Sequence, residues 1–181
     1  MEKPKVATVW LEGCSGCHMS FLDLDEDLVG ILSAVEVTVT PVTDFKDYEV
    51  PHGTALGIIE GAVGNTEQLE IVHRMRERCA VLMAWGDCAV FGGINTMWNA
   101  IPVAELLRKG YVETPSTVAG KEPRGADLPA LLPKVLAVNE VVPVECYIPG
   151  CPPSPEAIRY ALTEILAGRI PELPRQLIHF D

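Results

Sequence analysis

Short runs of apolar and β-branched residues recur along the chain, and helical patterns separate most of them. This alternation predicts an α/β fold with a mostly parallel sheet and helices on both faces, because parallel strands need long crossover connections. The chain has 181 residues, of which 48% are hydrophobic, so we expect a single domain over residues 1–181. The predicted strands are 5–11, 35–40, 55–63, 79–86 and 141–150, and the predicted helices are 17–32, 65–79, 97–109 and 154–168.

Three stretches interrupt this alternation. Residues 41–54 are predicted to form a polar connector. Residues 111–140 contain four prolines and two glycines, which predicts a long loop with at most one short helix. Loops of this length usually serve a function, so we expect this one to form an interface. Residues 169–181 are predicted to form an extended tail that lies against the protein body or a partner.

Charge and hydropathy exclude several kinds of partner. The formal net charge is −11, so nucleic acid and anionic membrane surfaces gain nothing from binding this chain. No run of 18 apolar residues occurs, which argues against a membrane span. The first residues show neither a basic segment followed by a long apolar stretch nor a twin-arginine signal. We therefore expect a cytoplasmic protein, with export as the passenger of a partner's signal as the alternative.

Four of the six cysteines come directly after a predicted strand, in turns marked by glycine or proline: Cys14, Cys17, Cys88 and Cys151. The carboxyl ends of parallel strands meet at one edge of a sheet, and ligands usually bind there. We therefore expect these four thiols to converge. Cys79 and Cys146 fall at the start of a strand and within one, so they are predicted to be core residues. Disulfides are not expected, because the core is adequate and no signal peptide is present.

Four converging thiols suit either zinc or an iron–sulfur cluster. Structural zinc sites usually take two close pairs of ligands, whereas here only Cys14 and Cys17 form a close pair. A 4Fe–4S cluster takes one thiolate per iron and tolerates scattered ligands, so the pattern favours a cluster, with a zinc-stabilised scaffold as the alternative. No G-x-G-x-x-G fingerprint is present, so NAD is not expected to bind here. A bound flavin is possible for such a fold, but no motif supports it.

Polar residues near these cysteines have several possible roles. Glu60 ends the third predicted strand and so belongs to the same edge. Two interpretations stay open for it: a supporting group that moves a proton or orients a turn, or a capping or interface carboxylate. Asp87 is expected to form a turn. His18 is expected to face solvent or an interface, because nothing else suggests ligation. Asp25 is placed at the edge of a subunit contact.

The segments "LEGCSGCHMSFL", "IIEGAV", "AWGDCAVFGGI" and "VVPVECYIPGCPPSPEAI" resemble the small subunit of nickel–iron hydrogenases. The related subunit family includes the 20-kDa subunit of respiratory NADH dehydrogenase. The resemblance covers nearly the whole chain and implies a flavodoxin-like domain with one proximal 4Fe–4S cluster. On this resemblance the cluster ligands are Cys14, Cys17, Cys88 and Cys151. The hydrogen-splitting nickel–iron site would lie in a separate large subunit.

Two features indicate the subfamily. The respiratory subunit has adjacent cysteines where this chain has Cys14-Ser15-Gly16-Cys17, which favours a hydrogenase. No cysteine follows Cys151, whereas the longer small subunits carry a further domain with two more clusters. The chain thus resembles the short small subunit of cytoplasmic, bidirectional NAD-reducing hydrogenases. A subunit of an energy-converting hydrogenase or of an NADH-dehydrogenase-like complex is the alternative.

This resemblance implies a relay rather than a catalyst. Electrons would pass from the large subunit through the cluster to diaphorase subunits, which carry their own clusters and flavin and reduce NAD. The chain alone would make or break no bond, so no catalytic residue is expected in it. Many relatives have glutamate directly before the first cysteine, whereas this chain has Gly13 there and Glu12 one position earlier. A proton-relay role is therefore not assigned to Glu12.

Overall fold

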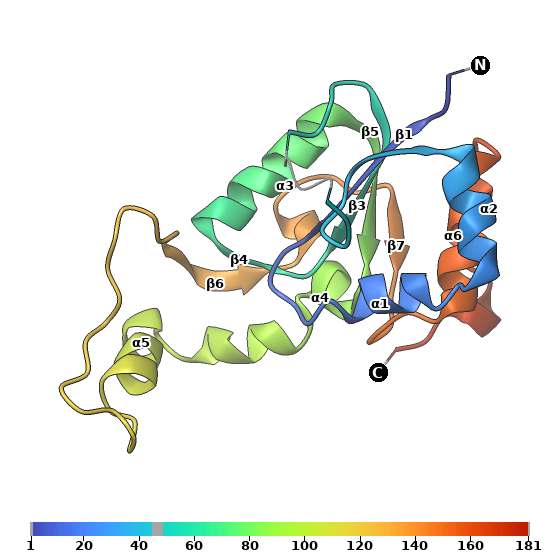
Figure 1. Ribbon diagram of the computed structural model, residues 1–181. Helices are drawn as coiled ribbons and strands as arrows, with labels where there is room; N and C mark the ends of the chain where they lie inside the picture. Colours follow the sequence, from blue (N-terminus) through green and yellow to red (C-terminus); the bar gives the residue numbers. More distant parts are fainter. Residues whose placement is uncertain (1, 45–48, 181) are drawn as a thin grey trace.

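The computed structural model describes residues 2–44 and 49–180. Its main sheet has five strands, all parallel, in the order β2-β1-β3-β5-β7 (Figure 1). Numbered among themselves, these strands follow the order 2-1-3-4-5, which is the flavodoxin-like topology. The predicted fold class is therefore confirmed. The strands are β1 (Lys5–Trp10), β2 (Glu36–Val39), β3 (Thr54–Glu60), β5 (Cys79–Trp85) and β7 (Cys146–Ile148).

Helices cover both faces of the sheet, and each face has its own apolar core (Figure 1). The predicted helix over 17–32 is in fact two helices, because the helical backbone is interrupted at Asp25, whose φ is 50°. In the described residues, no helix has the length and apolar character that crossing a membrane requires. One face carries α1 (Gly16–Leu22), α2 (Glu26–Ala34) and α6 (Pro155–Leu166), and the other carries α3 (Thr66–Arg78) and α4 (Gly86–Phe91).

The third predicted strand proves to be two strands that belong to different sheets. The apolar run over 55–63 breaks at Gly61, where φ is 89°, and continues as β4 (Val63–Asn65). Strand β4 pairs antiparallel with β6 (Leu131–Leu136), so the segment 111–140 is not only a loop. The prolines in that segment concealed the strand, although proline is tolerated at the edge of a sheet. The interface role of residues 111–140 stays a prediction.

The segment between α4 and β6 extends away from the main sheet (Figure 1). The helix predicted at 97–109 is interrupted at Pro102, which cannot donate a backbone hydrogen bond. The tail lies partly against the body, because Leu173 and Leu177 pack on the core. Residues 45–48 of the predicted polar connector lie outside the described residues. The remaining elements are η1 (Gly93–Ala100), α5 (Val103–Tyr111), η2 (Val138–Glu140) and η3 (Arg175–Leu177).

Strand β7 is shorter than the predicted run over 141–150. Directly before its first residue, the Glu145 side chain takes the place of a backbone acceptor for β5. The Glu145 carboxylate accepts the Leu82 N–H at 2.7 Å and two bonds from Arg76 at 2.9 and 3.0 Å. Burial alone would raise the pKa of Glu145, but the hydrogen bonds from Leu82 and Arg76 outweigh it and hold this pKa below its usual value. Glu145 thus connects the start of β7 to β5 and to the last turn of α3.

Candidate functional site

The strand register places the carboxyl ends of four strands side by side. Trp10 pairs with Glu60, Glu60 with Trp85, and Trp85 with Ile148. The segments that follow these ends carry the four cysteines: Cys14 precedes α1, Cys17 lies in its first turn, Cys88 lies in α4, and Cys151 precedes α6. The structure therefore brings together the four cysteines that the sequence selected as candidate ligands.

The four thiols lie close enough to influence one another. Burial raises the pKa of Cys17 well above its usual range, and Glu60, Cys88, Cys14 and Cys151 raise it further. The pKa of Cys88 is raised mainly by burial and then by the neighbouring thiols. A cation would remove this mutual repulsion, because four thiolates in one place need compensating positive charge. This donor set therefore fits a metal group bound by thiolates.

The site is buried on one side and open on the other. Cys17 is 8% exposed and its thiol lies 3.7 Å from the Trp85 carbonyl oxygen, whereas Cys14 and Cys151 are exposed and Cys88 is half-buried. All six cysteines are present as thiols in this structure. Among residues 2–44 and 49–180, no three His, Cys, Asp or Glu side chains are gathered tightly enough to hold a single metal ion.

A buried polar network supports the start of α1. The Glu60 carboxylate is 2% exposed and accepts the backbone N–H groups of Cys17 at 3.2 Å and His18 at 3.0 Å. It also contacts Nδ1 of His18, whose Nε2 lies 3.0 Å from the Thr8 hydroxyl. The capping interpretation of Glu60 is thus what the hydrogen bonds show.

The expectation for His18 was wrong. Its side chain is fully buried and lies between the rings of Trp10 and Trp85, with centroid separations of 5.7 and 5.8 Å. Sequence reasoning also missed Thr8, although a polar residue inside an apolar strand is a signal for a buried hydrogen bond. The partners of His18 come from residues 10 and 42 positions away, which local patterns do not reveal.

Hydrogen bonds fix the loops of the site to one another. Asp87 and Gly150 form a reciprocal pair, with the Asp87 N–H donating to the Gly150 carbonyl at 3.0 Å and the Gly150 N–H donating to Asp87 Oδ1 at 2.7 Å. This pair joins the start of α4, which carries Cys88, to the Cys151 loop. The Ser20 hydroxyl donates to the Pro153 carbonyl at 2.6 Å, which joins α1 to the same loop. Three separate segments are therefore held as one rigid frame.

Gly86 allows the backbone to pass close to Cys17. Its φ is 78°, in the left-handed region that other residues avoid. A Cβ atom at this position would lie 2.3 Å from the Cys17 Sγ atom. A side chain at residue 86 would therefore displace the most buried of the four thiols.

Alanine at Gly86 is expected to destabilise the site and reduce iron loading of the purified chain. The backbone strain alone costs about 1–3 kcal/mol, and the contact with Cys17 adds to it. Iron and acid-labile sulfide per chain would be measured after anaerobic purification. Gly30→Ala is the matched control, because a Cβ there meets nothing within 4 Å. Full loading of the Gly86 variant would contradict this account.

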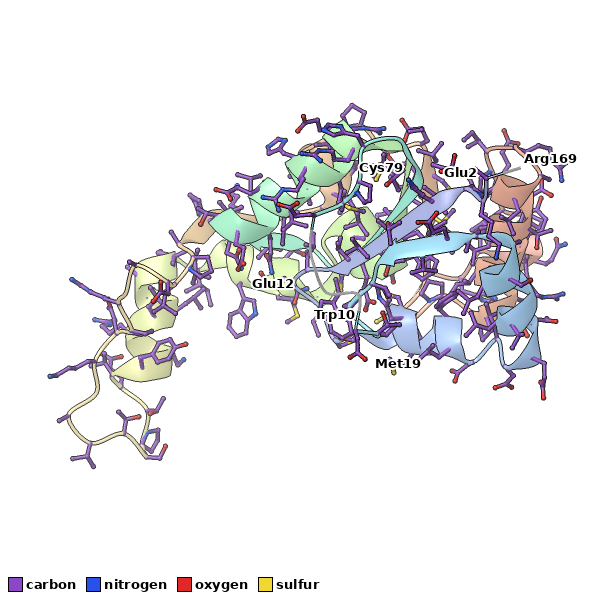
Figure 2. All side chains as sticks on the ribbon, turned by 45° about the horizontal axis from the view of Figure 1, so that its top comes forward. Glu2, Trp10, Glu12, Met19, Cys79 and Arg169 are labelled. Carbon is purple, nitrogen blue, oxygen red and sulfur yellow. The ribbon has the colours of Figure 1, made fainter. Side chains whose placement is uncertain are left out.

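The other two cysteines lie in the core, as predicted. Cys79 is 4% exposed and Cys146 is 2% exposed. Burial raises the pKa of Cys79 to about 11 and that of Cys146 to about 12. Figure 2 shows Cys79 far from Trp10 and Met19, which mark the edge where the four other cysteines gather.

Large apolar side chains are exposed directly after Cys88, on α4 and η1. Phe91 is 56%, Ile94 70%, Met97 71% and Trp98 54% exposed. A group of large exposed apolar side chains usually marks a site where another molecule binds. We call these four residues the α4–η1 patch.

Comparison with known proteins shows the family. A family model described as "NADH ubiquinone oxidoreductase, 20 Kd subunit" matches residues 14–165. The delta subunit of the NAD-reducing hydrogenase HoxS from Cupriavidus necator is 38% identical over 182 residues, which cover 99% of this chain and 86% of that protein.

Solved structures agree. A chain of an NAD⁺-reducing [NiFe]-hydrogenase crystallised in its H2-reduced state superposes with a TM-score of 0.94 at 36% identity, over 99% of this chain and all of that one. A chain of the [NiFeSe]-hydrogenase from Dm. baculatum shares the fold alone, with a TM-score of 0.63 at 16% identity over 98% of this chain and 70% of that one. The chain therefore belongs to the family of the NADH ubiquinone oxidoreductase 20-kDa subunit, and within that family it is a hydrogenase subunit.

Proposed function

We propose that this chain is the electron-transfer small subunit of an NAD-reducing nickel–iron hydrogenase, and that Cys14, Cys17, Cys88 and Cys151 hold one 4Fe–4S cluster. The observation that carries the proposal is the convergence of four thiols from three loops at the carboxyl edge of the sheet. When bound, such a cluster accepts and donates single electrons. The chain's own residues bind it, orient it and exclude water from one side.

The arrangement of ligands supports a cluster over zinc. A structural zinc ion needs four ligands within about 2.3 Å of one point. Within the described residues no three candidate ligands are gathered for a single ion, whereas four thiols share one neighbourhood. Metal analysis of the anaerobically purified chain tests this: a 4Fe–4S protein contains about four irons and four sulfides per chain, and stoichiometric zinc without iron would refute the proposal.

We propose two kinds of partner subunit for this chain. We propose that the α4–η1 patch contacts the large subunit that holds the nickel–iron site, because the patch begins on α4, which carries Cys88, and a Cβ atom at Gly93 would lie 2.9 Å from the Cys88 Sγ atom. Diaphorase subunits with clusters and flavin would take the electrons onward to NAD, which is consistent with the name "NAD-reducing hydrogenase" of the 38% identical relative. Because the complex would reduce NAD, we propose that it lies in the cytoplasm, as the sequence predicts.

Serine at both Ile94 and Met97 is expected to weaken the complex with the large subunit by at least about tenfold in affinity, or about 1.4 kcal/mol, because exposed apolar anchors supply much of an interface's binding energy. Co-purification with a tagged large subunit would measure this. Val29→Ser on α2 is the matched control, since Val29 is 71% exposed, like Met97 and Ile94. An equal loss in the Val29 variant, or no loss in the double variant, would contradict the proposed interface.

A further inference from the structure

Glu60 is a buried acid that an electron-transfer site does not obviously need. It ends β3 and is 2% exposed, and its neighbours along the sheet edge are Trp10 and Trp85. A buried carboxylate is costly unless donors satisfy its oxygens. Here the donors are the N–H groups of Cys17 and His18 and the ring of His18. The chain therefore keeps an acid directly behind a thiol that we propose as a ligand.

Glu60 determines which backbone N–H groups at the start of α1 are available as hydrogen-bond donors near the Cys17 thiol. Backbone N–H groups at a helix start stabilise negative charge in their neighbourhood. Hydrogen bonds from N–H groups to the sulfur atoms of an iron–sulfur cluster belong to the factors that set its potential. Glu60 accepts the N–H groups of Cys17 and His18, so neither donates to sulfur in this structure. This withdrawal removes two donors that would stabilise an added electron.

The negative charge of Glu60 also disfavours an added electron. Its carboxylate oxygen Oε1 lies 3.2 Å from the Cys17 nitrogen, inside the core of the protein. Interactions between charges are stronger there than in water. The carboxylate contacts the backbone of Cys17 directly, so a negative charge on Glu60 disfavours further negative charge at this position. Reduction adds one negative charge to the group that Cys17 binds.

His18 holds the acid in place. Its Nδ1 contacts Glu60, its Nε2 lies 3.0 Å from the Thr8 hydroxyl, and Trp10 and Trp85 enclose the ring. We propose that Glu60, positioned by His18, lowers the reduction potential of the cluster by withholding two N–H donors and by placing a negative charge behind Cys17. This inference rests on the proposed function, and it assigns Glu60 a positioning role rather than a catalytic one.

Redox titration of the anaerobically purified complex, followed by electron paramagnetic resonance, tests the inference. Glu60→Gln removes the charge and keeps the shape, so the midpoint potential is expected to rise by at least the equivalent of a tenfold change in the equilibrium constant, about 59 mV for a one-electron couple. Glu60→Asp keeps the charge and is expected to lie closer to the wild type than Glu60→Gln does. An unchanged potential in Glu60→Gln would overturn the inference.

Two further variants keep the test decisive. Glu145→Gln is the matched control, because Glu145 also accepts a backbone N–H but lies at the amino ends of the strands. It is expected to lower thermal stability and leave the potential unchanged, whereas an equal rise would show that destabilisation alone moves the potential. If Glu60→Gln fails to assemble, His18→Gln replaces it: the acid then loses the ring that positions it, and the potential is expected to rise toward that expected for Glu60→Gln. An equal or lower potential in that variant would also overturn the inference. Absence of a 4Fe–4S cluster in the wild-type complex would instead refute the proposed function.

Discussion

Serine at Cys14, Cys17, Cys88 or Cys151 is expected to abolish the cluster or convert it to one with fewer irons. Each thiol would bind one iron, and a hydroxyl is a poor substitute for a thiolate at such a site. The largest loss is expected at Cys17, because its thiol is the most buried of the four. Iron and sulfide per chain, together with the electron paramagnetic resonance spectrum of the reduced protein, would measure the effect.

Serine at Cys79 or Cys146 provides the internal control for this experiment. Both residues are buried cysteines, so the substitution costs stability in the same way, but neither belongs to the group of four thiols. Their iron content is expected to match that of the wild type. Loss of the cluster from Cys146→Ser together with a harmless Cys151→Ser would show that the ligand set is wrong.

Much of this site could be predicted because its ligands follow strands. A short apolar run marks a buried parallel strand, and the residue after it must reach the carboxyl edge of the sheet. That rule placed Cys88 and Cys151 beside Cys14 although more than 60 residues separate each from the next. It also separated these cysteines from Cys79, which starts a strand and so lies at the opposite edge.

The interior of the site could not be predicted in the same way. His18 follows Cys17 at the start of a helix, where a polar residue usually meets solvent, and only the approach of Glu60 and Thr8 makes a buried position favourable. The end of β3 was hidden for a related reason. Residues 55–63 form one apolar run, and the turn at Gly61 depends on a backbone bridge between Glu12 and Ala62. Pairings between distant segments decide both cases, and periodicity within one segment carries no information about them.

Cys88→Ser in the complete complex is expected to separate two activities. Hydrogen-driven reduction of NAD should fall to the background rate, because electrons from the large subunit would lack their exit. On the proposed function, oxidation of NADH by an artificial dye should persist at the wild-type rate, because that reaction would use only the diaphorase subunits. Hydrogen–deuterium exchange should persist in part, since heterolytic splitting of hydrogen needs no net electron transfer.

Cys88 is the best position for this experiment because of how its helix is held. Helix α4 follows β5 directly, and β5 lies between β3 and β7 in the sheet. The reciprocal hydrogen bonds of Asp87 and Gly150 fix α4 to the Cys151 loop without using the Cys88 side chain. Half-buried Cys88 also costs less to replace than fully enclosed Cys17, so the frame of the site should survive and the subunits should assemble. Subunit content of the purified complex would be verified by gel densitometry, and the assays would then be run on the same sample. Wild-type hydrogen-to-NAD turnover in an assembled complex whose small subunit holds no cluster would refute the relay.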